Sequence, residues 1–274
     1  MNQEYSAAAL AALAQGKAFS DLAGQVVFIT GAASGIGLAM AHAFAKSGAR
    51  LALLDINPET LKAADQSLRE AAPGVEVRTR TAAVNDQAAV EQAVGEAVDQ
   101  WGRLDVLLNN AGGSMNCPTL ELSGEQWRQA IDININGVFY CAQAAGRRMT
   151  AEGSGVIINT ASMYGLIAAP NRAAYCASKA AVAMLTRVLA VEWAEAGVRV
   201  NAIAPGYVQT ALVDELVEQG RMDLPALVHR TPAGRLGSPE EIAALALFMA
   251  SIHAAFMNGH VVVVDGGWSA YGYL

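Results

Sequence analysis

Seven short runs of apolar, largely β-branched residues recur along this chain, and longer segments with helix signals separate them. The runs are Val26 to Thr30, Leu51 to Leu54, Val75 to Thr81, Val106 to Asn109, Val156 to Thr160, Val198 to Ile203 and Val261 to Val264. Nearly continuous apolar character is typical of parallel strands that are covered on both faces. The alternation therefore predicts an α/β fold, a doubly wound parallel sheet of about seven strands with helices on both faces.

The segments between these runs begin with recognisable helix caps. Pro58 is expected at a first helical position, and Ser123 with Gln126 and Ser238 with Glu241 have the spacing of a capping box. These signals place helices after the second, fourth and sixth strands. They support the alternation inferred from the apolar runs.

No linker or compositional shift divides the chain, so we expect a single domain over residues 21–274, preceded by an N-terminal arm at residues 1–20. The stretch from Pro205 to about Gly237 shows no clear strand or core helix. Long connections of this kind in compact domains tend to be functional. We therefore expect a substrate lid at about residues 205–237.

Composition excludes several function classes. Of the 274 residues, 18 are Lys or Arg and 25 are Asp or Glu, and this acidic balance without a basic stripe argues against nucleic acid or an anionic membrane as a partner. No apolar stretch is expected to approach the ~18 residues of a membrane span. The apolar run from Ala7 to Ala14 lacks a preceding Lys or Arg, so we expect a cytoplasmic protein without a signal sequence. The three cysteines and four histidines show no metal-ligand spacing, so no metal is expected.

A glycine-rich turn follows the first predicted strand directly, over Thr30 to Gly37, with the spacing G-x-x-x-G-x-G. Glycines at a strand-to-helix junction permit a tight turn and let backbone N–H groups approach a pyrophosphate, although a turn of this kind can also exist without a ligand. Asp55 ends the second strand, 24 residues beyond Gly31. An acid there can accept hydrogen bonds from ribose hydroxyls and repel a 2′-phosphate. Together these features predict a Rossmann-type domain that prefers NAD(H).

With further motifs in order, the sequence resembles the short-chain dehydrogenase/reductase family from about Leu22 to Trp268. The motifs are Thr30 to Gly37, Asn109-Asn110-Ala111-Gly112, Asn134 in Asn-Ile-Asn-Gly, Ser162, Tyr175-Cys176-Ala177-Ser178-Lys179, Asn201 to Gly206 and Val264-Asp265-Gly266-Gly267. Any one could arise by chance, but seven in order carry the resemblance. Within the family, the chain looks most like polyol or sugar dehydrogenases and 3-oxoacyl reductases.

The resemblance implies a catalytic tetrad of Asn134, Ser162, Tyr175 and Lys179. Tyr175 would transfer the alcohol proton, and Ser162 would donate a hydrogen bond to the substrate oxygen. Lys179 is four residues from Tyr175, so both side chains project from one face of a helix, and its ammonium favours the phenolate. The family role of Asn134 is to interrupt its helix and fix a water that links the lysine to solvent. Asn136 lies two positions on, so an insertion would shift this match.

The resemblance also implies the cofactor contacts. They are Gly31, Ser34, Gly35, Ile36, Gly37, Asp55, Val84, Asn110, Ala111, Gly112, Tyr175, Lys179, Pro205, Gly206, Val208 and Thr210. One position departs from the family, because Ala83 stands where many relatives have an Asp that accepts from adenine. The missing hydrogen bond should weaken cofactor binding by about 1 kcal/mol.

The expected reaction is hydride transfer between NAD(H) and a secondary alcohol or ketone, with a small polyol, sugar or hydroxy acid as the substrate. Two alternatives remain, a 3-oxoacyl-thioester reductase and a non-catalytic dinucleotide-binding sensor. A non-catalytic sensor would not need the four residues of the tetrad, so their presence argues against this alternative. The resemblance further implies a homotetramer, with helices from about Ser123 to Met149 and from Tyr175 to Ala194 pairing across two-fold axes.

Overall fold

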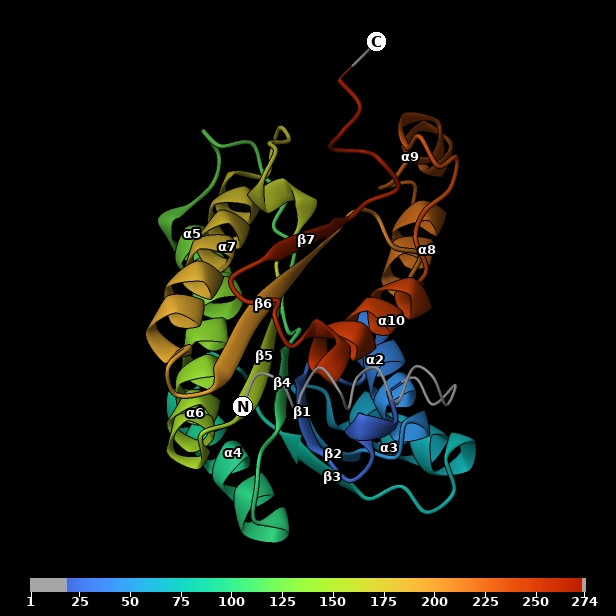
Figure 1. Cartoon of the computed structure of the whole chain (residues 1–274). Coiled ribbons are helices and arrows are strands. Elements are labelled where there is room, and N and C mark those ends of the chain that lie inside the picture. Colours follow the sequence, from blue (N-terminus) through green and yellow to red (C-terminus); the bar gives the residue numbers. More distant parts are fainter. Residues whose placement is uncertain (1–18, 273–274) are drawn as a thin grey trace.

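A computed structural model of the chain describes residues 19–272; most of the expected arm, residues 1–18, lies outside the described residues. Seven strands form one parallel sheet in the order β3-β2-β1-β4-β5-β6-β7 (Figure 1). Their bounds are β1 Val26–Thr30, β2 Arg50–Asp55, β3 Val77–Thr81, β4 Val106–Asn109, β5 Gly155–Thr160, β6 Val198–Pro205 and β7 Val261–Val264. The predicted doubly wound fold is confirmed.

Helices cover both faces of this sheet (Figure 1). Helices α2, α3 and α10 lie on one face, and α4 to α7 lie on the other. The helices are α2 Gly35–Lys46, α3 Pro58–Ala71, α4 Gln87–Trp101, α5 Gly124–Ile131, α6 Gly137–Glu152, α7 Ala173–Trp193, α8 Ala211–Glu218, α9 Leu224–Arg230 and α10 Pro239–Ala250. Short helical turns are η1 Ser20–Leu22, η3 Met163–Gly165 and η4 Ile252–Ala254, and η2 Asp132–Asn136 is a π-helical segment.

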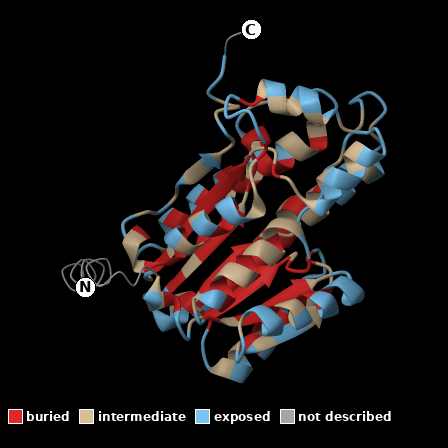
Figure 2. Ribbon diagram, turned by 90° about the vertical axis from the view of Figure 1, so that its right-hand side faces the viewer, coloured by how far each residue is buried: buried red, intermediate tan, exposed pale blue. Residues whose placement is uncertain are grey.

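Strand β1 shows how the two apolar layers arise. Its successive side chains point to opposite faces, so Val27 and Ile29 pack in one cluster with Phe44 of α2, whereas Phe28 packs in the other with Cys141 of α6. All five residues of β1 are buried. Figure 2 shows the same pattern across the sheet, with buried strands between helices whose outer faces are exposed.

The predicted caps are present. Ser123 and Ser238 each accept the backbone N–H three residues on, and the side chains of Gln126 and Glu241 complete both capping boxes. Pro58 opens α3. These local signals were readable because a cap depends on side chains within one helical turn.

Two expectations about exposure were wrong. Strand β3 lies at the edge of the sheet with a neighbouring strand on one side only, and three of its five residues, Arg78, Thr79 and Thr81, are exposed. The stretch at residues 205–237 is not a structureless loop, since it contains α8 and α9, capped by Thr210 and Asp223. Neither helix has a fully buried residue, which explains why no core pattern marked them.

Helix α7 also differs from expectation. It is the one helix within residues 19–272 whose length and composition would allow it to cross a membrane, although no such stretch was expected from the sequence. Its apolar residues have a different explanation, because Val182, Leu189 and Ala190 are buried in the core beside the sheet.

The strand order reverses between β2 and β4, both of which pair with β1. In open parallel sheets, ligands bind at the carboxyl ends of the strands beside such a reversal. Helix α2 starts there, at Gly35. This places Gly35, Ile36 and Gly37 in its first turn.

Gly37 fixes how closely α2 approaches the end of β1. A Cβ added there would lie 2.0 Å from the carbonyl oxygen of Gly31 and 2.6 Å from Nδ2 of Asn110. We expect Gly37→Ala to lower the free energy of unfolding by ~3 kcal/mol or more, because backbone must move to relieve the overlap. Gly95→Ala is a matched control on α4, where a Cβ meets nothing within 4 Å and should be neutral or stabilising. Equal melting temperatures for the two variants would contradict this account.

Candidate active site

A cavity of about 620 Å³ opens at the carboxyl ends of β1, β2, β4, β5 and β6. Sixteen of the residues named from the sequence line it, namely Gly31, Ser34, Gly35, Ile36, Asp55, Val84, Asn110, Ala111, Gly112, Ser162, Tyr175, Lys179, Pro205, Gly206, Val208 and Thr210. Gly37 and Asn134 do not, since they lie behind the wall. The chain thus gathers segments more than 170 residues apart into one site.

The glycine turn forms one end of the cavity and is held from β4. The hydroxyl of Thr30 accepts the backbone N–H groups of Asn110 and Ala111, each at 3.0 Å. The side-chain amide of Asn110 donates in return to the carbonyls of Thr30 and Gly31. Gly31 and Gly35 have φ of +61° and +51°, a conformation that glycine adopts without steric cost. The side chains of Thr30 and Asn110 therefore hold the turn in place.

Asp55 lies beside the turn, at the end of β2. Its Oδ2 accepts the backbone N–H of Ala33 at 3.0 Å, and its Oδ1 accepts the N–H of Asn57 at 3.1 Å. Each carboxylate oxygen can accept a second hydrogen bond. The carboxylate is thus fixed in place while it keeps acceptor capacity towards the cavity.

Tyr175 and Ser162 meet at the opposite end. Tyr175 lies in the first turn of α7, and Ser162 follows β5, where its Oγ accepts the N–H of Tyr164 at 3.1 Å. Burial raises the pKa of Tyr175, and the hydrogen bond with Ser162 and the positive charge of Arg172 oppose that rise. The phenol therefore needs nearby positive charge to lose its proton near neutral pH.

Lys179 lies one helical turn beyond Tyr175. Its side chain is buried, with 3% of the residue exposed, and its Nζ donates to the carbonyl of Thr160 at 2.8 Å. The Nζ lies 5.9 Å from the centre of the Tyr175 ring. Burial removes the ammonium from water and lowers the pKa of Lys179 to about 8. The structure confirms that the two side chains share one helix face.

The structure also distinguishes Asn134 from Asn136. Both lie in the π-helical segment η2, so the helix is interrupted at this point. The side chain of Asn134 is fully buried; it accepts from the N–H of Gly113 at 2.9 Å and donates to the Gly113 carbonyl at 2.9 Å and to Ser178 Oγ at 3.3 Å. Asn136 donates instead to Asp132 at 2.7 Å. Asn134 is therefore the asparagine next to the lysine helix.

Several lining residues were missed or left undecided by sequence reasoning. Tyr164 and Tyr207 both line the cavity, with hydroxyl oxygens 3.1 Å apart. Met163 lines it too, whereas Trp268 packs behind Tyr207 at a ring distance of 5.2 Å. Arg172 was not identified, although its position three residues before Tyr175 on the approach to α7 is a signal that could have found it.

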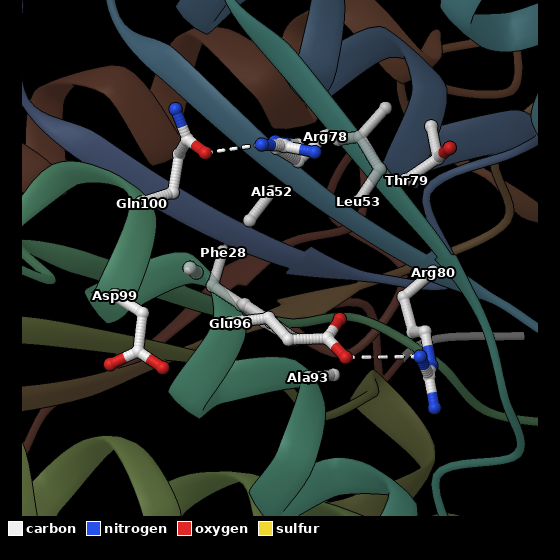
Figure 3. A pocket seen from close by; sticks show the side chains of 11 residues that line it. Phe28, Ala52, Leu53, Arg78, Thr79, Arg80, Ala93, Glu96, Asp99 and Gln100 are labelled. Atoms are coloured by element: carbon white, nitrogen blue, oxygen red, sulfur yellow. Dashed lines mark hydrogen bonds and ion pairs between the residues drawn. The ribbon is translucent and has the colours of Figure 1, made fainter.

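A second hollow lies between the edge strand β3 and α4 (Figure 3). Both of its arginines have partners within it, since Arg80 pairs with Glu96 at 3.0 Å and Arg78 donates to Gln100. No group of three His, Cys, Asp or Glu side chains in residues 19–272 could hold a metal ion. The reactive groups are thus concentrated in the larger cavity.

Comparison with known proteins identifies the family. A family model described as enoyl-(acyl carrier protein) reductase matches residues 31–269. The chain belongs to the short-chain dehydrogenase/reductase family. It is an NAD(P)-dependent oxidoreductase that acts on CH–OH groups of small-molecule alcohols or the corresponding ketones.

Among its relatives, D-threitol dehydrogenase of Mycolicibacterium smegmatis is 42% identical over 90% of this chain and 94% of its own length. Galactitol 2-dehydrogenase (L-tagatose-forming) of Cereibacter sphaeroides is 43% identical over 91% of this chain and 97% of its own. The crystal structure of an NAD⁺-bound xylitol dehydrogenase is similar, with a TM-score of 0.84 and 33% identity over 90% of this chain and 99% of that one.

The buried lysine has a consequence for stability. The folded pKa of Lys179 lies below the ordinary value, so the unfolded chain binds the proton more tightly. We expect Lys179→Met to raise the free energy of unfolding at pH 7 by on the order of 2–3 kcal/mol. This advantage should be full below pH 8 and fade as the pH rises from about 8 to 10.5, where the wild-type fold no longer holds a charged lysine. Urea unfolding of both proteins across this range is the measurement, and a pH-independent difference would contradict it.

Proposed function

We propose that this dehydrogenase uses NAD(H) to interconvert a secondary alcohol and a ketone in a small polyol, sugar or hydroxy acid, with Tyr175 as the acid–base residue. The observation that carries the proposal is that Tyr175 and Ser162 both lie in the wall of the cavity, with Lys179 one helical turn beyond Tyr175. A phenol placed in this way can exchange a proton with a carbinol oxygen.

The other residues have supporting roles in this proposal. Ser162 donates a hydrogen bond to the substrate oxygen, where charge develops during the reaction. Lys179 favours the phenolate of Tyr175 by its charge and binds the hydroxyls of the nicotinamide ribose. Asn134 positions the Gly112–Gly113 segment beside the lysine, because a Cβ at Gly112 would lie 3.0 Å from Asn134 Oδ1 and 3.3 Å from Lys179 Nζ. Its expected role in fixing a water stays a prediction.

The cavity residues fit a nicotinamide dinucleotide. The glycine turn presents side-chain-free backbone at the start of α2, where N–H groups and the helix dipole favour a pyrophosphate. At the adenosine end, Val84 offers a backbone N–H, and further along the cavity Pro205 to Thr210 form the wall opposite. When bound, the cofactor supplies the hydride donor or acceptor.

NAD(H) is the proposed form because of Asp55. Among the described residues that line the cavity, the charged ones are Asp55, Arg172 and Lys179, and the two cations lie at the other end. A 2′-phosphate would therefore meet a carboxylate with no cation beside it. Solved relatives include one with bound NAD⁺ and one with bound NADP, so the preference rests on this chain's own residues.

The charges of the lid favour a small substrate over an acyl group that is carried on a protein. One relative is a 3-oxoacyl-[acyl-carrier-protein] reductase of Thermotoga maritima, 38% identical, so the alternative is real. A carrier that is acidic would need free cations at the rim. Of the three lid arginines, Arg235 pairs with Glu241 at 2.6 Å, Arg230 stacks on Trp268 at 4.8 Å, and Arg221 makes no ion pair within the described residues. The rim therefore offers a single guanidinium without an acid or a ring beside it, and not a cationic patch for docking.

We further propose a homotetramer, as the family resemblance implies. Exposed apolar side chains on α5, α6 and α7 are Trp127, Phe139, Met184, Val188 and Val191. An exposed apolar surface of this kind is typical of an interface between subunits. The cytoplasmic location stays a prediction.

Tyr175→Phe tests the reaction. We expect kcat on the best substrate of a panel of polyols, sugars, hydroxy acids and a 3-oxoacyl thioester to fall at least 10²-fold while NADH binding is retained, because only the proton donor is lost. Tyr140→Phe on α6, outside the cavity lining, is the matched control. Activity of Tyr175→Phe within tenfold of the wild type would refute the assignment, and a thioester preferred a hundredfold over every polyol would refute the substrate class.

Asp55 tests the cofactor preference. Asp55→Asn keeps a side-chain oxygen for the N–H of Ala33 but removes the negative charge, so we expect the NAD/NADP ratio of Kd values to narrow at least about tenfold, or ~1.4 kcal/mol. Asp55→Ser should narrow it in the same direction. Titration of both cofactors gives the ratio. Tighter NADPH than NADH binding by the wild type would show that the proposed preference is wrong.

A further inference from the structure

Arg172 is held over the cavity by a rigid turn. Asn171, just before it, has φ of +61°, and the Asn171 carbonyl accepts the backbone N–H of Cys117 at 2.8 Å. The Arg172 carbonyl accepts the N–H of Cys176 in the first turn of α7. These contacts fix the backbone on both sides of Arg172, so its side chain enters the cavity from a defined point.

The guanidinium of Arg172 lies among three phenol rings that line the cavity. Its Cζ is 5.1 Å from the ring centre of Tyr164 and 6.0 Å from those of Tyr175 and Tyr207. Stacking on aromatic faces stabilises a guanidinium but leaves its N–H groups, which lie in its own plane, free to donate. The rings therefore orient the group without using its hydrogen-bonding capacity.

No acid within the described part of the chain pairs with Arg172, and its guanidinium makes no hydrogen bond there. Six other arginines of the described chain form ion pairs, as Arg80 does with Glu96 (Figure 3) and Arg235 does with Glu241. An unpaired guanidinium in a partly closed site is costly unless a ligand supplies the counter-charge.

We infer that Arg172 binds a carboxylate of the substrate, and that the substrate is a hydroxy acid rather than a neutral polyol. This rests on the proposed function, because it takes the carbinol to react at Tyr175. A guanidinium binds a carboxylate through two parallel N–H donors. The 6.0 Å between Arg172 Cζ and the Tyr175 ring centre places that carboxylate within a few bonds of the reacting carbon.

The remaining groups at this end agree with an anion. The lid acids Asp214, Glu215, Glu218 and Asp223 do not line the cavity. Tyr164 and Tyr207 share a hydrogen bond, and burial raises the pKa of Tyr164, so the Tyr164 phenol stays neutral. Both hydroxyls can bind hydroxyls of the same substrate. The names of relatives do not decide between the classes, since they include galactitol and gluconate dehydrogenases.

Arg172 has a second effect that the test must separate. Its charge also opposes the rise in the pKa of Tyr175, so its loss could slow every substrate. Substrate pairs that differ only in the carboxylate remove this ambiguity, because a change in Tyr175 acts equally on both members. Gluconate with sorbitol, and 4-hydroxycyclohexanecarboxylate with its carboxamide, are such pairs.

The experiment compares the wild type with Arg172→Gln, Arg172→Lys and the control Arg221→Gln. Arg221 is a lid arginine whose side chain hydrogen-bonds only Gln219 in the described residues and does not line the cavity. With NAD, we expect Arg172→Gln to lower kcat/KM at least tenfold more for the acid than for its neutral partner. Arg172→Lys should restore part of the preference for the acid. Arg221→Gln should leave kcat/KM for both substrates unchanged. Equal losses for both partners, with a shifted pH profile, would show that Arg172 only tunes Tyr175 and would overturn the inference. A wild-type preference for the neutral partner would also overturn it.

A binding measurement keeps the inference testable without turnover. Cyclohexanecarboxylate and cyclohexanecarboxamide are titrated into the NADH complex, and melting temperatures check that each variant is folded. We expect the wild type to bind the acid more tightly and Arg172→Gln to lose that preference, whereas equal binding by the wild type would refute the inference. Failure of the proposed function looks different, since it would appear as unchanged activity in Tyr175→Phe.

Discussion

The carbonyl of Gly31 is the contact on which the active site depends. It accepts the side-chain amide of Asn110 from β4, and Gly37 of α2 packs against it with no room for a Cβ. One peptide group thus joins β1, β4 and α2 at the point where the strand order reverses. The start of α2 is fixed there, and its first residues, Gly35 and Ile36, line the cavity. Asp55 adds a fourth element by accepting the N–H of Ala33.

The opposite end of the cavity is built from groups that are costly to bury. The ammonium of Lys179 is removed from water and donates to one carbonyl, that of Thr160. The burial lowers the pKa of Lys179 to about 8. Asn134 lies in a π-helical segment, and its side-chain amide donates to the Gly113 carbonyl and to Ser178 Oγ. Such features persist where the surrounding structure determines them completely, and they concentrate at functional sites. Here they surround the phenol of Tyr175, whose own burial disfavours the phenolate and makes the neighbouring cations necessary.

The end of the cavity that holds Tyr175 contains residues of two kinds, those that match the family's motifs and those outside these motifs. The glycine turn, Ser162, Tyr175 and Lys179 match motifs of the family, and in the proposed function they place the reaction at a carbinol. Arg172, Tyr164 and Tyr207 come from a turn, a short helical segment and the start of the lid, and they line the same end of the cavity as Tyr175. The guanidinium of Arg172 has no acid of the described chain beside it, which is why we propose that it distinguishes acidic from neutral substrates. In that proposal, specificity rests on residues outside the tetrad.

The sequence by itself determined the strands, the helix caps and the spacing of Tyr175 and Lys179, because each depends on residues within a turn or a short run. It also determined the glycine turn, since positive φ at Gly31 and Gly35 demands that residue type. Tertiary structure alone decided the rest. The exposed edge at β3 depends on strand order, and the choice between Asn134 and Asn136 depends on which one reaches Gly113. The spacing of Arg172 and Tyr175 could have marked Arg172 as a candidate, but its place between the rings of Tyr164 and Tyr207 depends on segments 8 and 35 residues away, which only the tertiary structure brings together.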